Sequence, residues 1–169
     1  MKSDELRSIQ APLKEQYRTH PETAFVTLKA EGQIGSGVSC TVATGRALVQ
    51  AGLHPATGGT GSQACSGDML LQALAGCAGV TMSAVATALG IEIRDGTVRV
   101  EGDLDFRGTL GVSKDTPVGL QRIRLSFDLV TTATDEQLTN LLRLTERYCV
   151  VYQTLRQPPE ISFSHRRLA

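Results

Sequence analysis

Residues 65–82 constrain the fold most, because they combine small and apolar residues at a density typical of a helix buried on most of its faces. Cys77 lies in the middle of this stretch, between two glycines. Each glycine costs about 1 kcal/mol relative to alanine in a helix, so such residues are useful only where another backbone comes close. The sequence therefore predicts a long central helix, with Ser66 as its N-cap, Leu89 near its end, Gly90 after it and a second helix packed against it.

Length and composition predict one soluble globular domain. The chain has 169 residues, of which 41% are apolar and 20% charged, and its formal net charge is zero. This neutrality, without a basic aromatic-rich stretch, argues against a nucleic-acid partner. No uninterrupted apolar run reaches the roughly 18–20 residues of a membrane span, and the first residues lack the apolar core of a signal peptide. We therefore expect a cytoplasmic protein with no membrane partner.

The remaining pattern predicts an α+β fold, with two groups of antiparallel strands separated by the buried helix. Residues 1–22 are expected to form an N-terminal helical arm, and residues 23–169 the main domain. The predicted elements are a helix from Ser3 to His20, strands over 24–30, 38–43 and 46–50, a loop over 51–64, one or two strands over 91–106 with a turn or bulge at Asp95-Gly96, a strand over 120–130, a helix opened by Thr134, a short helix after Cys149 and a closing strand over 161–165.

Four cysteines are present: Cys40, Cys65, Cys77 and Cys149. No CxxC or HxxxH spacing occurs, which argues against a structural zinc site. In a reducing cytosol, four spaced cysteines indicate free thiols or redox chemistry. Cys40 is expected to be a packed strand residue, whereas Cys65 has two open interpretations, as a spare resolving thiol or as a packed bystander.

Three segments together resemble the OsmC/Ohr family of thiol-dependent peroxidases. They are Gly58-Gly59, the apolar run from Asp68 to Cys77, and residues 146–155, which contain Cys149. The resemblance covers roughly residues 24–165. It implies an intertwined homodimer in which six-stranded antiparallel sheets wrap around two central helices, with two active sites at the subunit interface.

The resemblance also implies a reaction, the reduction of an organic hydroperoxide to its alcohol. Cys77 matches the attacking cysteine and Cys149 the resolving one, and neither flavin, haem nor metal is needed. The expected reductant is a dithiol such as a lipoyl group. This chemistry is reasonable on its own terms, because a thiolate attacked by peroxide becomes a sulfenic acid and then condenses with a second thiol. The condensation requires the two Cα atoms to come within roughly 7 Å.

The attacking thiol must be ionised, which burial opposes, so the sequence predicts a cation that lowers its pKa. The resemblance implies an activating arginine in the sheet or loop before the central helix, and Arg46 is the candidate because it is the only arginine between the first predicted strand and Cys77. The resemblance likewise makes Asp68 the candidate acidic helper, acting through an arginine or the other subunit. The alternatives are a surface arginine at a strand end and a carboxylate that complements the helix dipole. The chain also departs from the family pattern after Cys149, where Val150 and its successors replace a common Pro-Val-Ser.

Two further functions remain open. One is a small-ligand binding protein of the same fold with little or no peroxidase activity, for which a ligand would raise the melting temperature. The other is a structural dimer module whose buried thiols are inert, and whose cysteines would stay unlabelled until unfolding.

Overall fold

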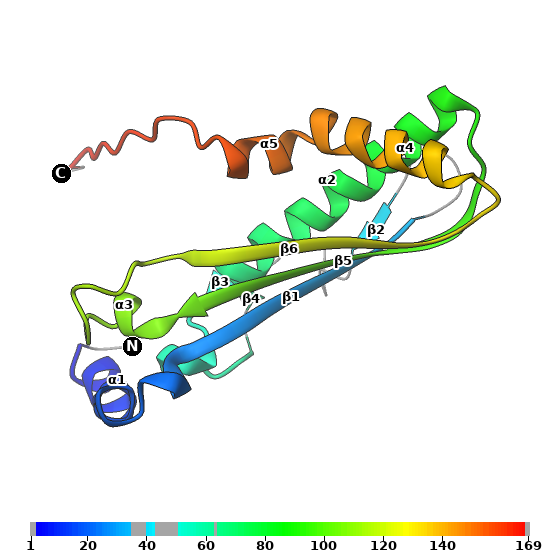
Figure 1. Ribbon diagram of the computed structural model, residues 1–169. Coiled ribbons are helices and arrows are strands. Elements are labelled where there is room, and N and C mark those ends of the chain that lie inside the picture. Colours follow the sequence, from blue (N-terminus) through cyan, green and yellow to red (C-terminus); the bar gives the residue numbers. More distant parts are fainter. Residues whose placement is uncertain (1–2, 35–39, 43–50, 63, 168–169) are drawn as a thin grey trace.

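Four antiparallel strands form the main sheet, in the order β2-β1-β5-β6 (Figure 1). The computed structural model describes residues 3–34, 40–42, 51–62 and 64–167. The strands are β1 (Phe25–Ile34), β2 (Cys40–Val42), β5 (Ile93–Asp105) and β6 (Leu120–Thr131). Within the described chain β6 pairs with β5 alone, so the outer edge of β6 is open. The sheet and its helices confirm the α+β prediction, while the predicted strand over 46–50 lies outside the described residues.

β5 is a single strand, which decides between the one or two strands predicted over 91–106. Its pairing with β6 changes register between Ile93 and Asp95, so the predicted turn or bulge is a bulge. Val98 and Val100 are fully buried, and Arg99 between them is exposed. This period of two places the inward face of β5 against the central helix.

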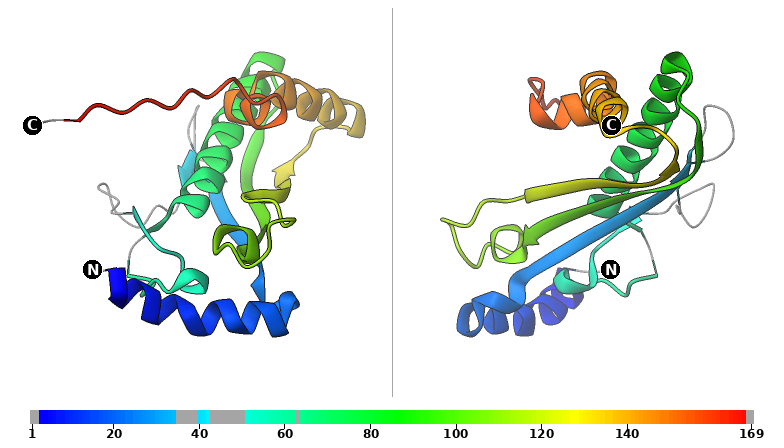
Figure 2. Two further views of the ribbon diagram at one scale, coloured as in Figure 1. Left: turned by 90° about the vertical axis from the view of Figure 1, so that its left-hand side faces the viewer. Right: turned by 45° about the vertical axis from the view of Figure 1, so that its right-hand side comes forward.

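The central helix α2 (Ser66–Leu89) packs against β1 and β5 and, on the same side of the sheet, against two C-terminal helices (Figure 2). Its completely or almost completely buried side chains are Leu71, Leu74, Ala75, Ala78 and Met82. Burying one such leucine contributes roughly 1.5–3 kcal/mol. The predicted position of this helix is therefore confirmed, and it forms the centre of the core.

The two ends of α2 test the capping predictions. Gly90 adopts a left-handed conformation (φ 66°) and its N–H bonds the Ala86 carbonyl, as predicted for a residue after the helix. The prediction of Ser66 as N-cap is wrong, because Cys65 is the N-cap and Ser66 the first helical residue. Cys65 is extended and pairs with Gly52 in a short parallel ladder, which fixes where the helix begins.

By length and composition alone, α2 is long and apolar enough to cross a membrane. The sequence contains no uninterrupted apolar run of that length, because polar residues and glycines are spaced along the helix. Half of its most apolar window is buried inside the protein. Core helices of soluble proteins have the same property, so α2 is weak evidence for a membrane.

The segment 51–64 was predicted as a loop, and this prediction is wrong in part. It contains the short strands β3 (Ala51–Gly52) and β4 (Ala64–Cys65), which pair in parallel, and the 3-10 helix η2 (Pro55–Thr57). Strands of two residues are too short to show a period of two in a sequence, so the pattern could not reveal them.

The N-terminal helix α1 (Ser3–Thr19) lies beside η2 and α3 (Phe106–Thr109), and η1 (Pro21–Ala24) follows it. The Tyr17 hydroxyl, on a buried side chain, donates to the Ala56 carbonyl at 2.6 Å. Gln10 Nε2 donates to the Thr57 carbonyl at 3.3 Å. These contacts attach α1 to the segment before α2, while the division into an arm over 1–22 and a domain over 23–169 stays a prediction.

The helix α4 (Asp135–Tyr148) begins with the predicted cap. Thr134 Oγ1 accepts from the Gln137 N–H at 3.3 Å, and Gln137 Oε1 accepts from the Thr134 N–H at 2.9 Å. This reciprocal capping box satisfies two backbone donors that a helix start would otherwise leave free. After Cys149 the chain continues as the helix α5 (Val150–Arg156), also as predicted.

The closing strand predicted over 161–165 is wrong, because these residues have no regular structure. Ile161 and Phe163 are 74% and 97% exposed, and the tail extends away from the other elements (Figure 1). A strand requires a neighbouring strand, and none lies beside this tail in the described chain.

Candidate functional site

Two free thiols meet where α2 packs against α4 and α5. Cys77 is half-buried near the middle of α2, and Cys149 is 1% exposed at the junction between α4 and α5. The two thiols lie close enough that each shifts the pKa of the other. The packing of the three helices therefore brings together the pair that the sequence singled out.

The backbone amides of Val151 and Val150 and the side chains of Cys149 and Thr81 act on the Cys77 thiol as hydrogen-bond donors that favour its charged form. Burial raises the pKa of the Cys77 thiol, but these donors together outweigh burial and lower the pKa below its ordinary value. The first amides of α5 have no partner within their own helix, so a thiolate is a suitable acceptor for them. Among the described residues, the donors around Cys77 include no arginine.

Cys149 has the opposite electrostatic environment. Burial is the largest cause that raises the pKa of its thiol to about 11. The neighbouring Cys77 raises this pKa further, and the backbone amides of Tyr152 and Val151 oppose the rise. Cys149 therefore stays protonated at neutral pH. The pair consists of one thiol that ionises readily and one that does not.

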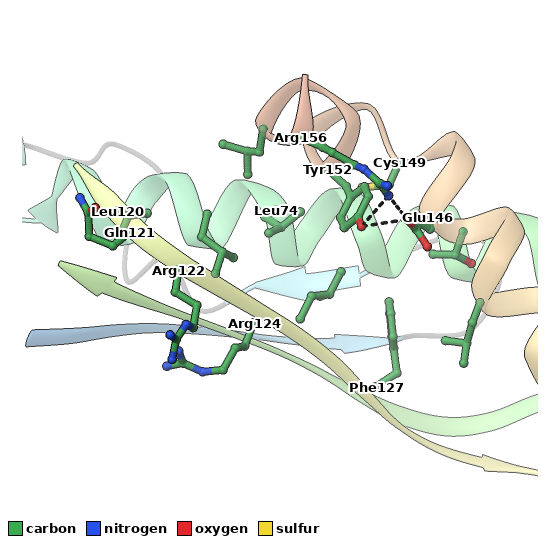
Figure 3. Close-up of a pocket in the computed structure, with 15 residues that line it drawn as sticks. Leu74, Leu120, Gln121, Arg122, Arg124, Phe127, Glu146, Cys149, Tyr152 and Arg156 are labelled. Carbon is green, nitrogen blue, oxygen red and sulfur yellow. Dashed lines mark hydrogen bonds and ion pairs between the residues drawn. The ribbon is translucent and has the colours of Figure 1, made fainter. Parts of the chain in front are cut away.

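A cavity of about 710 Å³ adjoins Cys149, between β6 and the helices α2, α4 and α5 (Figure 3). Consecutive residues of β6, from Leu120 to Leu125, line it, so the cavity follows the open edge of that strand. The apolar part of its lining comprises Leu74, Leu120, Ile123, Leu125, Phe127, Leu142 and Leu155. An organic molecule could bind here with its apolar part close to Cys149.

Three polar side chains form a cluster on the helix side of this cavity (Figure 3). The Tyr152 hydroxyl donates to Glu146 Oε1 at 2.9 Å, and Arg156 forms an ion pair with the same carboxylate. Arg156 also donates to the Tyr152 hydroxyl at 3.4 Å. Burial and the neighbouring Glu146 raise the pKa of Tyr152. The sequence did not indicate this cluster, because the break at Cys149 separates Glu146 from α5 and removes the helical spacing that would relate the residues.

The other predicted site residues do not join the thiol pair. Asp68 is half-buried in the first turn of α2, about 13 Å along the helix from Cys77. Burial raises the pKa of its carboxyl, and the charge of His54 opposes that rise. Arg46 lies outside the described residues.

Cys65 lies about 18 Å along α2 from Cys77. That separation is too large for a disulfide within one subunit, so its interpretation as a packed bystander is favoured. Within the described residues, no group of three His, Cys, Asp or Glu side chains could hold a metal ion.

Comparison with known families places this geometry in context. Residues 59–164, more than half of the chain, match the family model described as OsmC-like protein. The chain belongs to the OsmC-like family. The match includes α2, both cysteines and the Glu146–Tyr152–Arg156 cluster, and it confirms the resemblance seen in the sequence.

Solved structures support the OsmC-like fold. An OsmC-like hydroperoxide resistance protein from Jannaschia sp. CCS1 aligns with a TM-score of 0.59 at 17% identity, covering 82% of this chain and 91% of that one. An OsmC-like protein from Mycoplasma pneumoniae aligns with a TM-score of 0.56 at 18% identity, covering 79% and 86% respectively. Among proteins with curated descriptions, none matches the chain. At these identities the two structures show the fold alone.

Proposed function

We propose that this OsmC-like protein is a cysteine-based peroxidase that reduces organic hydroperoxides to alcohols. The observation that carries the proposal is the neighbouring pair of free thiols, in which the pKa of Cys77 is lowered and that of Cys149 is raised. A peroxidase of this kind needs one thiolate to attack the peroxide and a second thiol nearby to condense with the resulting sulfenic acid. Family membership and the OsmC-like hydroperoxide resistance protein of the same fold agree with this proposal.

The first step is attack by the Cys77 thiolate on the distal oxygen of the hydroperoxide. An S–O bond forms, the O–O bond breaks, and the leaving alkoxide takes up a proton to become the alcohol. Cys77 is thereby oxidised to a sulfenic acid. The amides of Val150 and Val151 stabilise the thiolate before this attack.

The second step joins the two cysteines. Cys149 loses its proton and attacks Cys77 Sγ, so that an S–S bond forms and hydroxide leaves as water. A dithiol, such as a lipoyl group, then returns the disulfide to two thiols by thiol–disulfide exchange. Tyr148 and Val150 beside Cys149 are 56% and 70% exposed, an apolar surface suited to a dithiol on an apolar chain.

The proposed substrate is organic because the cavity beside Cys149 is mostly lined by apolar side chains.

A second copy of the chain is the proposed partner, in an intertwined homodimer. The open edge of β6 and the exposed side chains of Ile161 and Phe163 favour such a partner, since a strand edge and an apolar tail are both stabilised by pairing. Light scattering would test the dimer, and a monomer at micromolar concentration would contradict it.

Substitution of the cysteines tests the reaction. Cys77→Ser is expected to abolish consumption of tert-butyl hydroperoxide, and Cys149→Ser to leave a Cys77 sulfenic acid that dimedone traps. Cys65→Ser is the matched control, because Cys65 lies at the far end of α2 and should leave turnover unchanged. Unchanged turnover in Cys77→Ser would overturn the proposal.

We also propose a cytoplasmic location, where thiols are kept reduced.

A second candidate function is that of a small-ligand binding protein. The 710 Å³ cavity favours it, because a volume of this size accommodates a drug-sized organic molecule. Slow or absent peroxide turnover, together with a ligand-dependent rise in melting temperature, would support this alternative over the peroxidase.

A further inference from the structure

Cys149 occupies the break between two helices. It is both the C-cap of α4 and the residue before α5, and its extended backbone (φ −71°, ψ 106°) turns the chain there. The Cys149 N–H donates to the Thr145 carbonyl, and the Cys149 carbonyl accepts from the Gln153 N–H, both at 2.9 Å. The angle between α4 and α5 therefore depends on the backbone torsions of a single residue, the one that carries the buried thiol.

The core holds the two helices to different degrees. α4 contributes the buried Thr145, whose hydroxyl donates to the sulfur of Met82 in α2 at 3.7 Å. All seven residues of α5 are described, and none of them is buried. Three of them pack partly buried against the core, namely Val151, Tyr152 and Leu155. Packing alone therefore fixes α4 more firmly than α5, and further contacts are needed to orient α5.

These further contacts converge on Glu146, in the last turn of α4 (Figure 3). Its Oε1 accepts from the Tyr152 hydroxyl at 2.9 Å and forms an ion pair with Arg156. Its main-chain carbonyl accepts from Gln153 Nε2 at 2.8 Å. Three side chains of α5 thus bond one residue of α4, and every one of these bonds crosses the break at Cys149.

A basic residue of α4 lies closer to Glu146 in the sequence. Arg143, three residues earlier, donates to Asn140 Oδ1 at 2.9 Å, while Glu146 pairs with Arg156 beyond the break. The side chains of Arg156 and Glu146 are 59% and 45% exposed, and exposed ion pairs contribute little to the free energy of unfolding. The main effect of this pair is therefore expected on the orientation of α5 and not on overall stability.

We propose that Glu146 is a positioning residue for Cys149: its carboxylate and carbonyl, bonded by side chains of α5, fix the angle between α4 and α5 and so direct Cys149 toward Cys77. The inference rests on the proposed function, in which Cys149 is the resolving thiol. A disulfide forms only within a narrow range of distances and torsions, so a change of this angle moves Cys149 out of reach.

The test equilibrates the whole protein with reduced and oxidised glutathione, without peroxide. The Cys77 thiolate attacks glutathione disulfide, so that a mixed disulfide forms and one glutathione thiolate leaves. The Cys149 thiol then loses its proton and attacks Cys77 Sγ, which forms the S–S bond and releases the second glutathione thiolate, to which a proton returns. The two protein thiols are oxidised and glutathione disulfide is reduced to two glutathione molecules. The equilibrium constant measures how well the fold holds the two thiols together.

Two variants each remove one partner of the ion pair, Glu146→Ala and Arg156→Ala. Each should lower the equilibrium constant about three- to tenfold and enlarge the fraction of mixed disulfide on Cys77, as expected for the loss of a charged hydrogen bond. The double variant should fall no further than the lower of the two, because both substitutions remove the same interaction. Arg143→Ala is the matched control, since its bond to Asn140 stays within α4. It should leave the constant unchanged.

Mass spectrometry after acid quenching and alkylation counts each species, and circular dichroism checks that every variant is folded. An unchanged constant in Glu146→Ala or in Arg156→Ala would overturn the inference, as would an equal fall in Arg143→Ala. A double variant that falls by the product of the two single effects would also overturn it, since the residues would then act independently. So would a parent protein that forms no disulfide between Cys77 and Cys149.

The outcome is separable from the test of the proposed function. If the constant falls as expected but the parent protein consumes no tert-butyl hydroperoxide, the peroxidase proposal fails and the role of Glu146 is supported. If the parent consumes peroxide and Glu146→Ala leaves the constant unchanged, the peroxidase proposal stands and the inference on Glu146 fails.

Discussion

Cys149, at the junction of α4 and α5, lies close enough to Cys77, near the middle of α2, that each thiol shifts the pKa of the other. The donors around Cys77 favour its charged form, and burial together with that charge disfavours ionisation of Cys149. The charge of one thiol therefore controls the protonation of the other.

This relationship predicts that alkylation distinguishes the two cysteines. With a pKa of about 11, Cys149 is ionised in only about one molecule in a thousand at pH 8, whereas the lowered pKa of Cys77 enlarges its thiolate fraction. Site-resolved mass spectrometry at pH 8 should find Cys77 labelled first. In Cys77→Ser, Cys149 should react at lower pH than in the parent, because the charge that raises its pKa is gone. Equal labelling of both cysteines in the folded parent would contradict this prediction.

The position of Cys149 depends on the packing of α4, which gives a second prediction. Leu141 is fully buried, while its neighbour Leu142 is 43% exposed at the edge of the cavity. Leu141→Ala should lower the free energy of unfolding by about 2–5 kcal/mol, because a cavity replaces a packed side chain. Leu142→Ala is the control and should lower it by less than about 1 kcal/mol. Urea unfolding measures both, and similar losses would show that α4 is not packed as described.

A third prediction concerns the segment before α2. A Cβ on Gly59 would lie 1.7 Å from the Leu53 carbonyl oxygen, so Gly59→Ala requires the backbone to move. Gly90, with φ of 66° and no atom within 4 Å of an added Cβ, carries only the cost of the left-handed conformation, about 1–2 kcal/mol. Thermal unfolding should therefore show a larger loss for Gly59→Ala than for Gly90→Ala. The reverse order would contradict the close approach of the two backbones.

The sequence predicted the elements whose signals are local. Small apolar residues and Gly90 indicated α2, the alternation over 120–130 indicated β6, and Thr134 with Gln137 indicated the start of α4. In each case the residues that carry the pattern also make the stabilising contacts, so no knowledge of distant partners was needed.

The features that the sequence missed depend on distant partners. Alternation over 161–165 is typical of a strand, but pairing requires a neighbour that this tail does not have in the described chain. The donors around Cys77 include backbone amides of Val150 and Val151, and no side-chain pattern encodes a free amide. The sequence predicted a cation beside Cys77, and it therefore gave no indication of these amides, which lower the pKa of Cys77.

Asp68 offers a final prediction, because two interpretations of this residue predict different effects of Asp68→Asn on stability. One is a buried carboxyl with a raised pKa, and the other is a carboxylate that complements the helix dipole. Burial raises the pKa of its carboxyl above the unfolded value of about 3.9. The native state therefore holds the proton more tightly than the unfolded state, and the free energy of unfolding should fall as pH rises from about 4 through the raised pKa. Asp68→Asn removes this dependence and should not lower stability at pH 7.

Asp135 is the matched control, since it is an exposed carboxylate in the first turn of α4. Asp135→Asn should lower the free energy of unfolding by about 0.5 kcal/mol, as expected where a carboxylate only complements the helix dipole. If Asp68 instead acts as the proposed acidic helper, through an arginine or the partner subunit, Asp68→Asn should lower peroxide turnover at least about tenfold with unchanged stability. Calorimetry and a turnover assay on both variants decide the matter: lost stability with full turnover in Asp68→Asn would assign Asp68 to the helix dipole alone.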